Sequence, residues 1–307
     1  MMRYLKRGAA LLMTLLMLAG GAVAQGTMFT EEQAQAAAER ALQEEDALKA
    51  ADSYTRVLTI NGRNFLYFAQ NSPEWNMLLA SKNQKEKRTF GSSGCAVAAL
   101  AIATANALPM ERLREVTSVA LIPVSVDSRS ITNSPNHQAG RFLIEKDSDF
   151  LRFWPVVLDN ITAQNNSIRI RENRSSNFYA GVLEVMGLRY QVTRDRQEML
   201  DALDEGALAI SCTGGGGSPY TSRSHYLTFA AKDEEYLYVL DPYARSELRR
   251  DVNHVIDVIE PGFQRVKLSN LRRFQTGSMY IIWPEADFVP YTPEKLAEII
   301  AKSNAHQ

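Results

Sequence analysis

The sequence predicts an α+β fold in which helices come first and an antiparallel sheet follows. An alanine-rich apolar run over 95–104 has the composition of a buried helix. Two largely apolar runs, 224–231 and 236–240, flank a polar turn and are typical of a β-hairpin. The 307 residues, 45% of them hydrophobic, are enough for one ordinary core or two small ones. Because no internal repeat or interdomain linker is apparent, we expect one domain.

The first 24 residues have the three regions of an export signal. Three basic residues give a positive start, residues 9–19 are apolar, and Ala22-Val23-Ala24 has the small-x-small form of a cleavage site. The apolar run is short for a membrane span, so a cleaved signal peptide over 1–24 is favoured over an uncleaved anchor. We therefore expect an exported protein, periplasmic or extracellular, with no integral membrane segment after signal cleavage.

The mature chain is expected to divide into three segments: a helical segment over 25–58, the main domain over 59–290, and a C-terminal helix over 291–307. Thr30-Glu-Glu-Gln33 has the form of a capping box, and helix-forming residues follow it to about residue 51. This first helix could be a spacer, a helix packed on the domain or an inhibitory prosegment. The C-terminal helix is predicted because Pro293 stands at a first helical position.

Local patterns predict the remaining elements of the main domain. Gly187 and Gly206 each follow a predicted helix, where a glycine favours the C-terminal turn. Residues 121–177 are the least readable and are expected to be an elaboration that could carry substrate selectivity. The glycine-rich stretch 213–219 lacks the ending of a phosphate loop and is expected to be a mobile loop beside a cleft. In chain order we expect a strand over 64–70, a turn over 71–75, helices from 95 to about 108 and over 111–119 and 178–185, a strand over 189–192, a helix over 194–204, a strand over 207–212, the hairpin strands, and a strand over 279–283.

Cys95 is expected to begin its helix directly after a Gly/Ser loop over 91–94. A thiol in that position faces unpaired backbone N–H groups and the positive end of the helix dipole, and both favour the nucleophilic thiolate. An inert, buried cysteine is the alternative for this stretch taken alone. Since Cys212 is the only other cysteine, a disulfide between the two is also open.

His225 and Asp241 are expected to lie side by side, because one begins a hairpin strand and the other follows the end of its partner strand. A carboxylate beside an imidazole fixes the tautomer and orientation of the ring. If this end of the hairpin faces Cys95, then Cys95, His225 and Asp241 form the nucleophile, base and orienting group of acyl transfer. Taken singly, a strand histidine and an Asp-Pro turn have commoner structural roles, but the ordered set favours function.

Four motifs occur in order between about Asn64 and Pro242. They are Tyr67-Phe-Ala-Gln70-Asn-Ser-Pro-Glu-Trp75, Gly91-Ser-Ser-Gly94-Cys95, Ser224-His225-Tyr226 and Val239-Leu240-Asp241-Pro242. With these motifs, the chain resembles the C39-like cysteine peptidase family, a branch of the papain-like superfamily. The resemblance implies a papain-like fold, in which a nucleophile helix packs on a C-terminal antiparallel β-sheet.

The resemblance also implies roles for individual residues. Cys95 would be the nucleophile, His225 the general base and acid, and Asp241 the orienting group. Gln70 would supply a side-chain N–H to the oxyanion hole, beside the backbone N–H of Cys95. The chain departs from many relatives in having Ala96-Val97-Ala98 after the cysteine and Ser224 before the histidine, which affects the shape of the cleft and hence the substrate.

The leading hypothesis is an exported thiol hydrolase that cleaves a peptide or amide bond through an acyl-enzyme, with a peptide or peptide-like substrate. An amidase or acyl transferase on cell-wall peptides would use the same residues. A catalytically silent papain-like binding module is the alternative of a different class. The formal net charge of −1 gives no electrostatic case for nucleic acid. The four histidines (137, 225, 254 and 306) lack ligand spacing, so neither a metal nor a nucleotide cofactor is expected.

Overall fold

The computed structural model describes residues 55–72, 75, 90–120, 124–125, 141–142, 151, 154–164, 175–213, 220, 224–244, 255–273 and 277–304. The chain divides into two compact units, residues 1–50 and 51–307, and every described residue belongs to the second. The predicted signal peptide, the helix predicted over 30–51, most of the glycine-rich loop and three of the four histidines lie outside the described residues.

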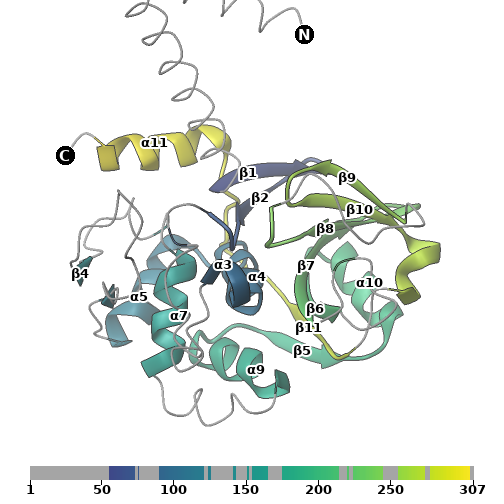
Figure 1. The fold of residues 1–307 in the computed structure, drawn as a ribbon, viewed down its shortest axis with the longest axis horizontal. Helices are drawn as coiled ribbons and strands as arrows, with labels where there is room; N and C mark the ends of the chain where they lie inside the picture. Colours follow the sequence, from purple (N-terminus) through teal and green to yellow (C-terminus); the bar gives the residue numbers. More distant parts are fainter. Residues whose placement is uncertain are drawn as a thin grey trace, which may run out of the picture. The chain divides into compact units, whose positions relative to one another are not determined.

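A seven-stranded sheet forms the centre of the second unit, and all neighbouring strands in it are antiparallel (Figure 1). The strand order is β5-β11-β6-β7-β8-β10-β9. The prediction of a mixed α and β fold with a late antiparallel sheet is therefore confirmed. The strands are β5 (Tyr190–Thr193), β6 (Leu208–Thr213), β7 (His225–Lys232), β8 (Tyr236–Leu240), β9 (Ile256–Glu260), β10 (Phe263–Lys267) and β11 (Met279–Ile282).

A separate hairpin precedes the helices. Strands β1 (Thr55–Ile60) and β2 (Arg63–Phe68) pair in antiparallel fashion around Asn61-Gly62, whose φ angles of 50° and 76° suit a two-residue hairpin turn. Because β1 begins at Thr55, the domain starts before the expected boundary between residues 58 and 59. A short pair, β3 (Val124–Ser125) and β4 (Arg141–Phe142), lies in the segment that was least readable.

The helices expected from residue 95 onward are present, with ends shifted by a few residues, whereas the helices over 90–93 and 154–164 were not predicted. The helix of Cys95 ends at Ala105 rather than near residue 108, and Asn106, Ala107 and Leu108 follow it as a hydrogen-bonded turn. No helix in the described part of the chain has the length and apolar character needed to cross a membrane. The helices are α3 (Phe90–Ser93), α4 (Cys95–Ala105), α5 (Met110–Ala120), α7 (Trp154–Gln164), α9 (Ser175–Val185), α10 (Arg196–Asp204) and α11 (Pro293–Asn304), with the 3-10 helix η4 (Leu268–Arg273).

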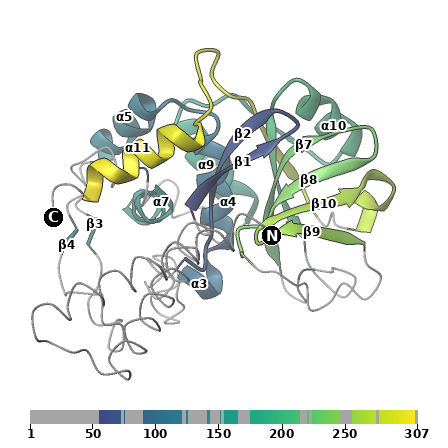
Figure 2. The same cartoon turned by 90° about the horizontal axis from the view of Figure 1, so that it is seen from above.

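Helix α4 is buried on all sides. It contacts β6 and β7 of the sheet, β2 of the hairpin and α7, and every residue from Ala96 to Ala105 is buried. In both views α4 lies between the sheet and the helix α7 (Figures 1 and 2). A helix that is apolar all round requires such an environment. The small side chains of its many alanines let the neighbouring strands and helices pack close to α4. The helix is therefore a fixed support for its first residue, Cys95.

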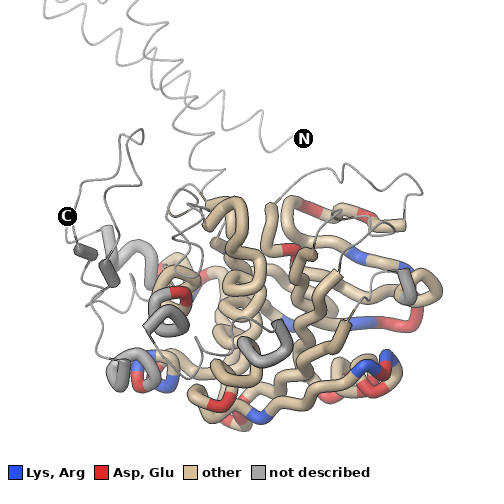
Figure 3. Tube along the Cα trace, turned by 60° about the horizontal axis from the view of Figure 1, so that its bottom comes forward, with Lys and Arg blue, Asp and Glu red and all other residues tan. Residues whose placement is uncertain are grey.

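The opposite face of the sheet is covered by α10. Leu208 and Ile210 of β6 belong to the buried cluster that contains α4, whereas Ala209 belongs to a second cluster with Met199 and Leu203 of α10. Alternation along a strand sends neighbouring side chains to opposite faces, so the two clusters lie on the two faces of the sheet. Charged residues gather on the outer strands and helices, and α4 itself has none (Figure 3).

Candidate active site

The approach to Cys95 differs from the sequence prediction. The expected Gly/Ser loop is wrong, because Phe90–Ser93 form the short helix α3. Gly94 then precedes α4, and no side chain caps the helix. A Cβ atom at Gly94 would lie 2.6 Å from both the carbonyl oxygen and ring Cδ1 of Phe90. The glycine therefore allows the chain to turn tightly from one helix into the next, and this turn sets the position of Cys95.

Cys95 and Cys212 are both half-buried and form no disulfide, so the alternative of a disulfide between them is not realised in the structure. Cys95 is the first residue of α4, whose first turn contains no acidic side chain. The dipole of α4 favours a negative charge at this end. A partly accessible thiol at a helix start is the environment in which cysteines become reactive.

His225 lies between Asp241 and Cys95. Its Nε2 is 2.6 Å from Oδ1 of Asp241, and a side-chain hydrogen bond also joins the imidazole to Cys95. Since Asp241 engages Nε2, Nδ1 is the ring nitrogen left for the thiol. His225 is 6% exposed and Asp241 is fully buried, so bulk water does not compete for this pair. The structure thus brings together three of the four predicted site residues in one hydrogen-bonded chain.

The pKa of His225 reflects opposing effects. Burial alone lowers it, but the charge and hydrogen bond of Asp241, with a further contribution from Cys95, raise the pKa to about 9. The imidazole is therefore protonated at neutral pH. A cation is thus held against the thiol on one side and the carboxylate on the other, and this stabilises the Cys95 thiolate.

Asp241 is itself held in place on every side. Its Oδ1 also accepts a hydrogen bond from the backbone N–H of Tyr243 at 2.8 Å, and its Oδ2 accepts one from Nε2 of Gln264 at 3.3 Å. The hydroxyl of Tyr67 donates to the backbone carbonyl of Asp241 at 2.8 Å. Sequence analysis assigned no role to Gln264 or Tyr67. Tyr67 was visible within a motif, but Gln264 lies in a strand that was not predicted.

Gln70 lies between Asp241 and the approach to Cys95. Its backbone N–H donates to the carbonyl of Pro242 at 2.6 Å, and its Nε2 donates to the carbonyl of Gly91 at 2.7 Å. The side chain is 3% exposed, and its Oε1 accepts no hydrogen bond. An amide nitrogen carries two hydrogens, so one N–H remains after the bond to Gly91. The residue is thus close to the site, and its role as an oxyanion donor stays a prediction.

Tyr179 of α9 is a further neighbour that sequence analysis missed. Its hydroxyl donates to the carbonyl of Ala96 at 3.3 Å, and its ring packs 5.2 Å from that of Tyr226. Burial, together with the nearby Tyr226, Cys95 and Cys212, raises the pKa of Tyr179 well above its usual value. The phenol therefore stays neutral and ties α9 to the first turn of α4. Only the position of Tyr179 in an apolar helical run could have indicated it.

No family model matches the chain, and a search of curated proteins also found no match. Within the described ranges, no group of three or more His, Cys, Asp or Glu side chains could hold a metal ion. The candidate site consists of a thiol at a helix start, a charged imidazole and a buried carboxylate. Such a set can carry out nucleophilic attack with proton transfer.

Proposed function

We propose that the protein is an exported cysteine hydrolase with a papain-like fold, similar to the C39-like peptidases, and that it cleaves a peptide or amide bond. The observation that carries this proposal is the continuous chain of hydrogen bonds from Cys95 through His225 to Asp241. Further support comes from the nucleophile helix, which packs on an antiparallel sheet whose central hairpin supplies the other two groups. The predicted signal peptide supports export.

The first half of the reaction forms an acyl-enzyme. The Cys95 thiolate attacks the carbonyl carbon, forming a C–S bond while the carbonyl π electrons move to oxygen. When the tetrahedral intermediate collapses, the C–N bond breaks and the His225 imidazolium gives its Nδ1 proton to the departing amine. The products of this half are a free amine, a thioester on Cys95 and a neutral imidazole.

The second half consumes water. Neutral His225 takes a proton from water through Nδ1, and the water oxygen attacks the thioester carbonyl. The C–S bond then breaks, which releases a carboxylic acid and restores the thiolate–imidazolium pair. Asp241 keeps Nε2 protonated and Nδ1 directed at the reaction throughout. An amine that replaced water in this half would turn hydrolysis into acyl transfer with the same residues.

Both tetrahedral intermediates carry a negative oxygen that needs donors. In the proposal, the remaining amide N–H of Gln70 and the backbone N–H of Cys95 supply them. A preorganised donor of this kind is typically worth about 3 kcal/mol of transition-state stabilisation. For this role the Gln70 side chain has only to keep its bond to Gly91, which fixes the amide plane.

The experiment compares alkylation of the two thiols in the mature protein. Iodoacetamide labelling across pH, read by peptide mass spectrometry, gives a rate for Cys95 and for Cys212 in the same sample. We expect Cys95 to react much faster than Cys212 below pH 7, and to lose this advantage in His225→Ala. Cys212 serves as the internal control because it is also half-buried and forms no disulfide, but it lies within the strand β6 rather than at the start of a helix.

A screen of fluorogenic peptides, amides and cell-wall fragments then tests turnover, with Cys95→Ser as the inactive control. Equal labelling of both thiols, or a Cys95 rate that does not change in His225→Ala, would contradict the proposed thiolate–imidazolium pair. Fast labelling without turnover of any peptide or amide would instead favour the binding-module alternative.

A further inference from the structure

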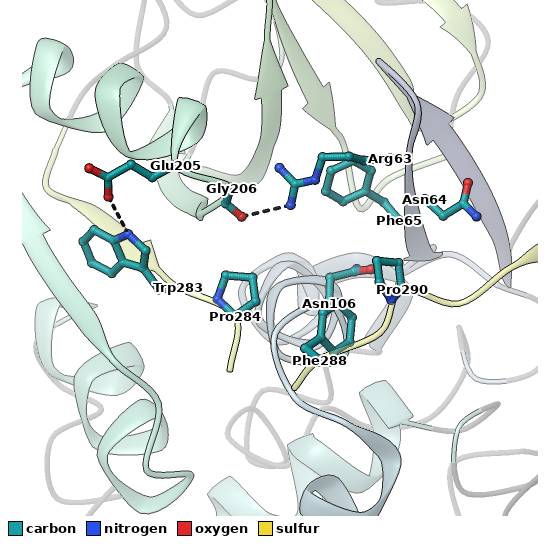
Figure 4. A pocket seen from close by; sticks show the side chains of 10 residues that line it. All are labelled: Arg63, Asn64, Phe65, Asn106, Glu205, Gly206, Trp283, Pro284, Phe288 and Pro290. Carbon is teal, nitrogen blue, oxygen red and sulfur yellow. Dashed lines mark hydrogen bonds between the residues drawn. The ribbon is translucent and has the colours of Figure 1, made fainter. Parts of the chain in front are cut away.

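A cavity of about 320 Å³ lies at the end of α4 remote from Cys95. It is bounded by the start of β2, the turn after α10 and the segment that follows β11 (Figure 4). Asn106, directly after the last residue of α4, lines it. The eleven residues of α4 rise by roughly 16 Å at about 1.5 Å each, so the cavity is separate from the candidate active site.

Arg63 is the positive side chain that lines this cavity, and a second guanidinium, that of Arg189, stacks on the ring of Trp283 in the cavity wall at 4.3 Å. The Arg63 guanidinium stacks over the Phe65 ring at 5.0 Å, and its Nη2 donates to the carbonyl of Gly206 at 2.9 Å. Burial lowers the pKa of Arg63, and among the described residues no carboxylate opposes that effect. A half-buried guanidinium with several unused N–H donors is suited to a carboxylate, which accepts two parallel hydrogen bonds.

The Asn106 side chain in the cavity wall is already fully engaged. Oδ1 of Asn106 accepts from the Leu66 backbone N–H, and its Nδ2 donates to the carbonyls of Leu66 and Ile102. Glu205 is exposed, and its Oε2 accepts from the indole N–H of Trp283 at 3.1 Å. Its carboxylate therefore lies in water at the rim. Arg63 is thus the charged donor that can meet an anionic ligand, and Asn64, whose Oδ1 accepts from the Thr59 hydroxyl, adds a neutral amide to the lining.

The remaining walls are flat and apolar. Phe65 and Trp283 lie on different sides of the cavity, and Pro284, Phe288 and Pro290 line the side opposite Arg63 (Figure 4). The segment that supplies the prolines is anchored where the N–H of Glu285 donates to the carbonyl of Ala107 at 2.8 Å. Aromatic and proline faces suit a planar apolar body. The volume is at the small end of the range for ligand pockets, which limits the ligand to a small molecule.

We propose that this cavity binds a small organic acid with an aromatic body, whose carboxylate pairs with Arg63 and whose ring lies between Trp283 and the prolines. The inference does not depend on the proposed hydrolase activity, because the cavity shares no residue with the candidate active site.

Trp283 provides a direct readout. Of the three tryptophans in the chain, Trp75 and Trp154 are fully buried, so added ligand reaches Trp283 alone. The probes are phenylacetate and its neutral match phenylacetamide, titrated into the mature protein while tryptophan emission and the indole N–H resonances are followed. We expect a saturable change with phenylacetate and binding about tenfold weaker for phenylacetamide, because the amide lacks the charge.

Arg63→Gln keeps a hydrogen-bonding side chain and removes the charge. We expect it to weaken phenylacetate binding about tenfold. Arg265→Gln is the matched control, since Arg265 also lies on a strand with its guanidinium over an aromatic ring, that of Tyr236, outside the cavity. It should bind phenylacetate as the unaltered protein does.

Equal affinity for phenylacetate and phenylacetamide would overturn the proposal. So would unchanged phenylacetate binding in a folded Arg63→Gln protein, or the absence of any saturable change at Trp283. If Arg63→Gln does not fold, as judged by circular dichroism, the comparison of acid and amide on the unaltered protein still decides.

Discussion

The side-chain amide of Gln264 lies 3.3 Å from Oδ2 of Asp241, and both side chains are fully buried. The other carboxylate oxygen accepts from His225 and from the N–H of Tyr243. Gln264 thus binds Oδ2, the carboxylate oxygen of Asp241 that His225 does not contact. The Oε1 of Gln264 accepts no hydrogen bond, and an unpaired buried oxygen costs free energy. Gln264 therefore holds Asp241 at the cost of leaving this oxygen unpaired.

Replacing Gln264 by Leu is therefore expected to loosen Asp241 without touching the reacting atoms. We expect the alkylation rate of Cys95 at neutral pH to fall by about threefold to tenfold, because the imidazolium is less firmly oriented. The pH profile of labelling should shift as well, which a purely structural role would not produce. Gln191→Leu is the control, since Gln191 is an exposed strand residue whose side chain donates to Glu198, away from the candidate site. An unchanged pH profile in Gln264→Leu would count against positioning.

The pKa of His225 is testable by NMR without a substrate. With labelled histidine, we expect one imidazole of the four to titrate at about 9. In Asp241→Asn this value should drop, because the carboxylate charge that raises the pKa is gone. Asp233→Asn, in the turn of the same hairpin, should leave it unchanged. A histidine signal that stays at about 9 in Asp241→Asn would refute the assigned cause.

The same shift predicts how stability depends on pH. The pKa of His225 rises from 6.5 in the unfolded chain to about 9 in the folded one, so the folded state binds the proton more tightly. The resulting stabilisation is fully present below pH 6.5 and is lost as pH rises through about 9. Urea unfolding at pH 6 and pH 10 should show this loss in the unaltered protein and a smaller one in Asp241→Asn. Equal losses of stability in the two proteins would show that the His225–Asp241 pair is not the source of this pH dependence.

Gly94 is expected to be intolerant of a side chain. Gly94→Ala places a Cβ against the Phe90 carbonyl oxygen, which is backbone and cannot rotate away. We expect a loss of about 1–3 kcal/mol in the free energy of unfolding, as for other overpacked sites. Cys95 labelling should slow too, because the start of α4 shifts. Gly277→Ala is the matched control, since no atom lies within 4 Å of its added Cβ. Equal stability of the two variants would contradict the packing role of Gly94.

Much of the fold was predictable because its signals are local. The apolar run of α4 and the β7–β8 hairpin are continuous in sequence, and Gly187 and Gly206 have the positive φ expected after a helix. Strands β9 and β10 were not predicted, because charged residues interrupt both. Their place in the sheet depends on pairing with β8, which no local pattern encodes.

The candidate site was predictable only in part for the same reason. The hairpin by itself brings His225 beside Asp241. This contact could therefore be predicted from the sequence, although 16 positions separate the two residues. Gln264 could not be linked, because its contact requires the unpredicted strand β10 to lie beside β8. The α3 turn was also missed. Four residues of Gly/Ser-rich sequence have weak helix propensity, and packing of Phe90 over Gly94 overrides it.

Asn106 fastens the far end of α4 to the first hairpin. Its amide makes three hydrogen bonds, two of them to the backbone of Leu66, and the side chain is 2% exposed. Asn106→Ala leaves the Leu66 N–H and carbonyl buried and unpaired, so we expect a loss of about 3 kcal/mol in the free energy of unfolding. Asn64→Ala, which removes the acceptor of an exposed hydrogen bond from the Thr59 hydroxyl, should cost much less.

The folded fraction of Asn106→Ala should still label at Cys95 as fast as the unaltered protein, because roughly 16 Å of rigid helix separates the two residues. Urea unfolding gives the stability, and labelling under fully native conditions gives the reactivity. If stability and reactivity fell together, α4 would not be a fixed support, and the position of Cys95 would depend on how the whole helix is seated. If only stability fell, the geometry at Cys95 would be set locally by Gly94, Phe90 and the His225–Asp241 pair.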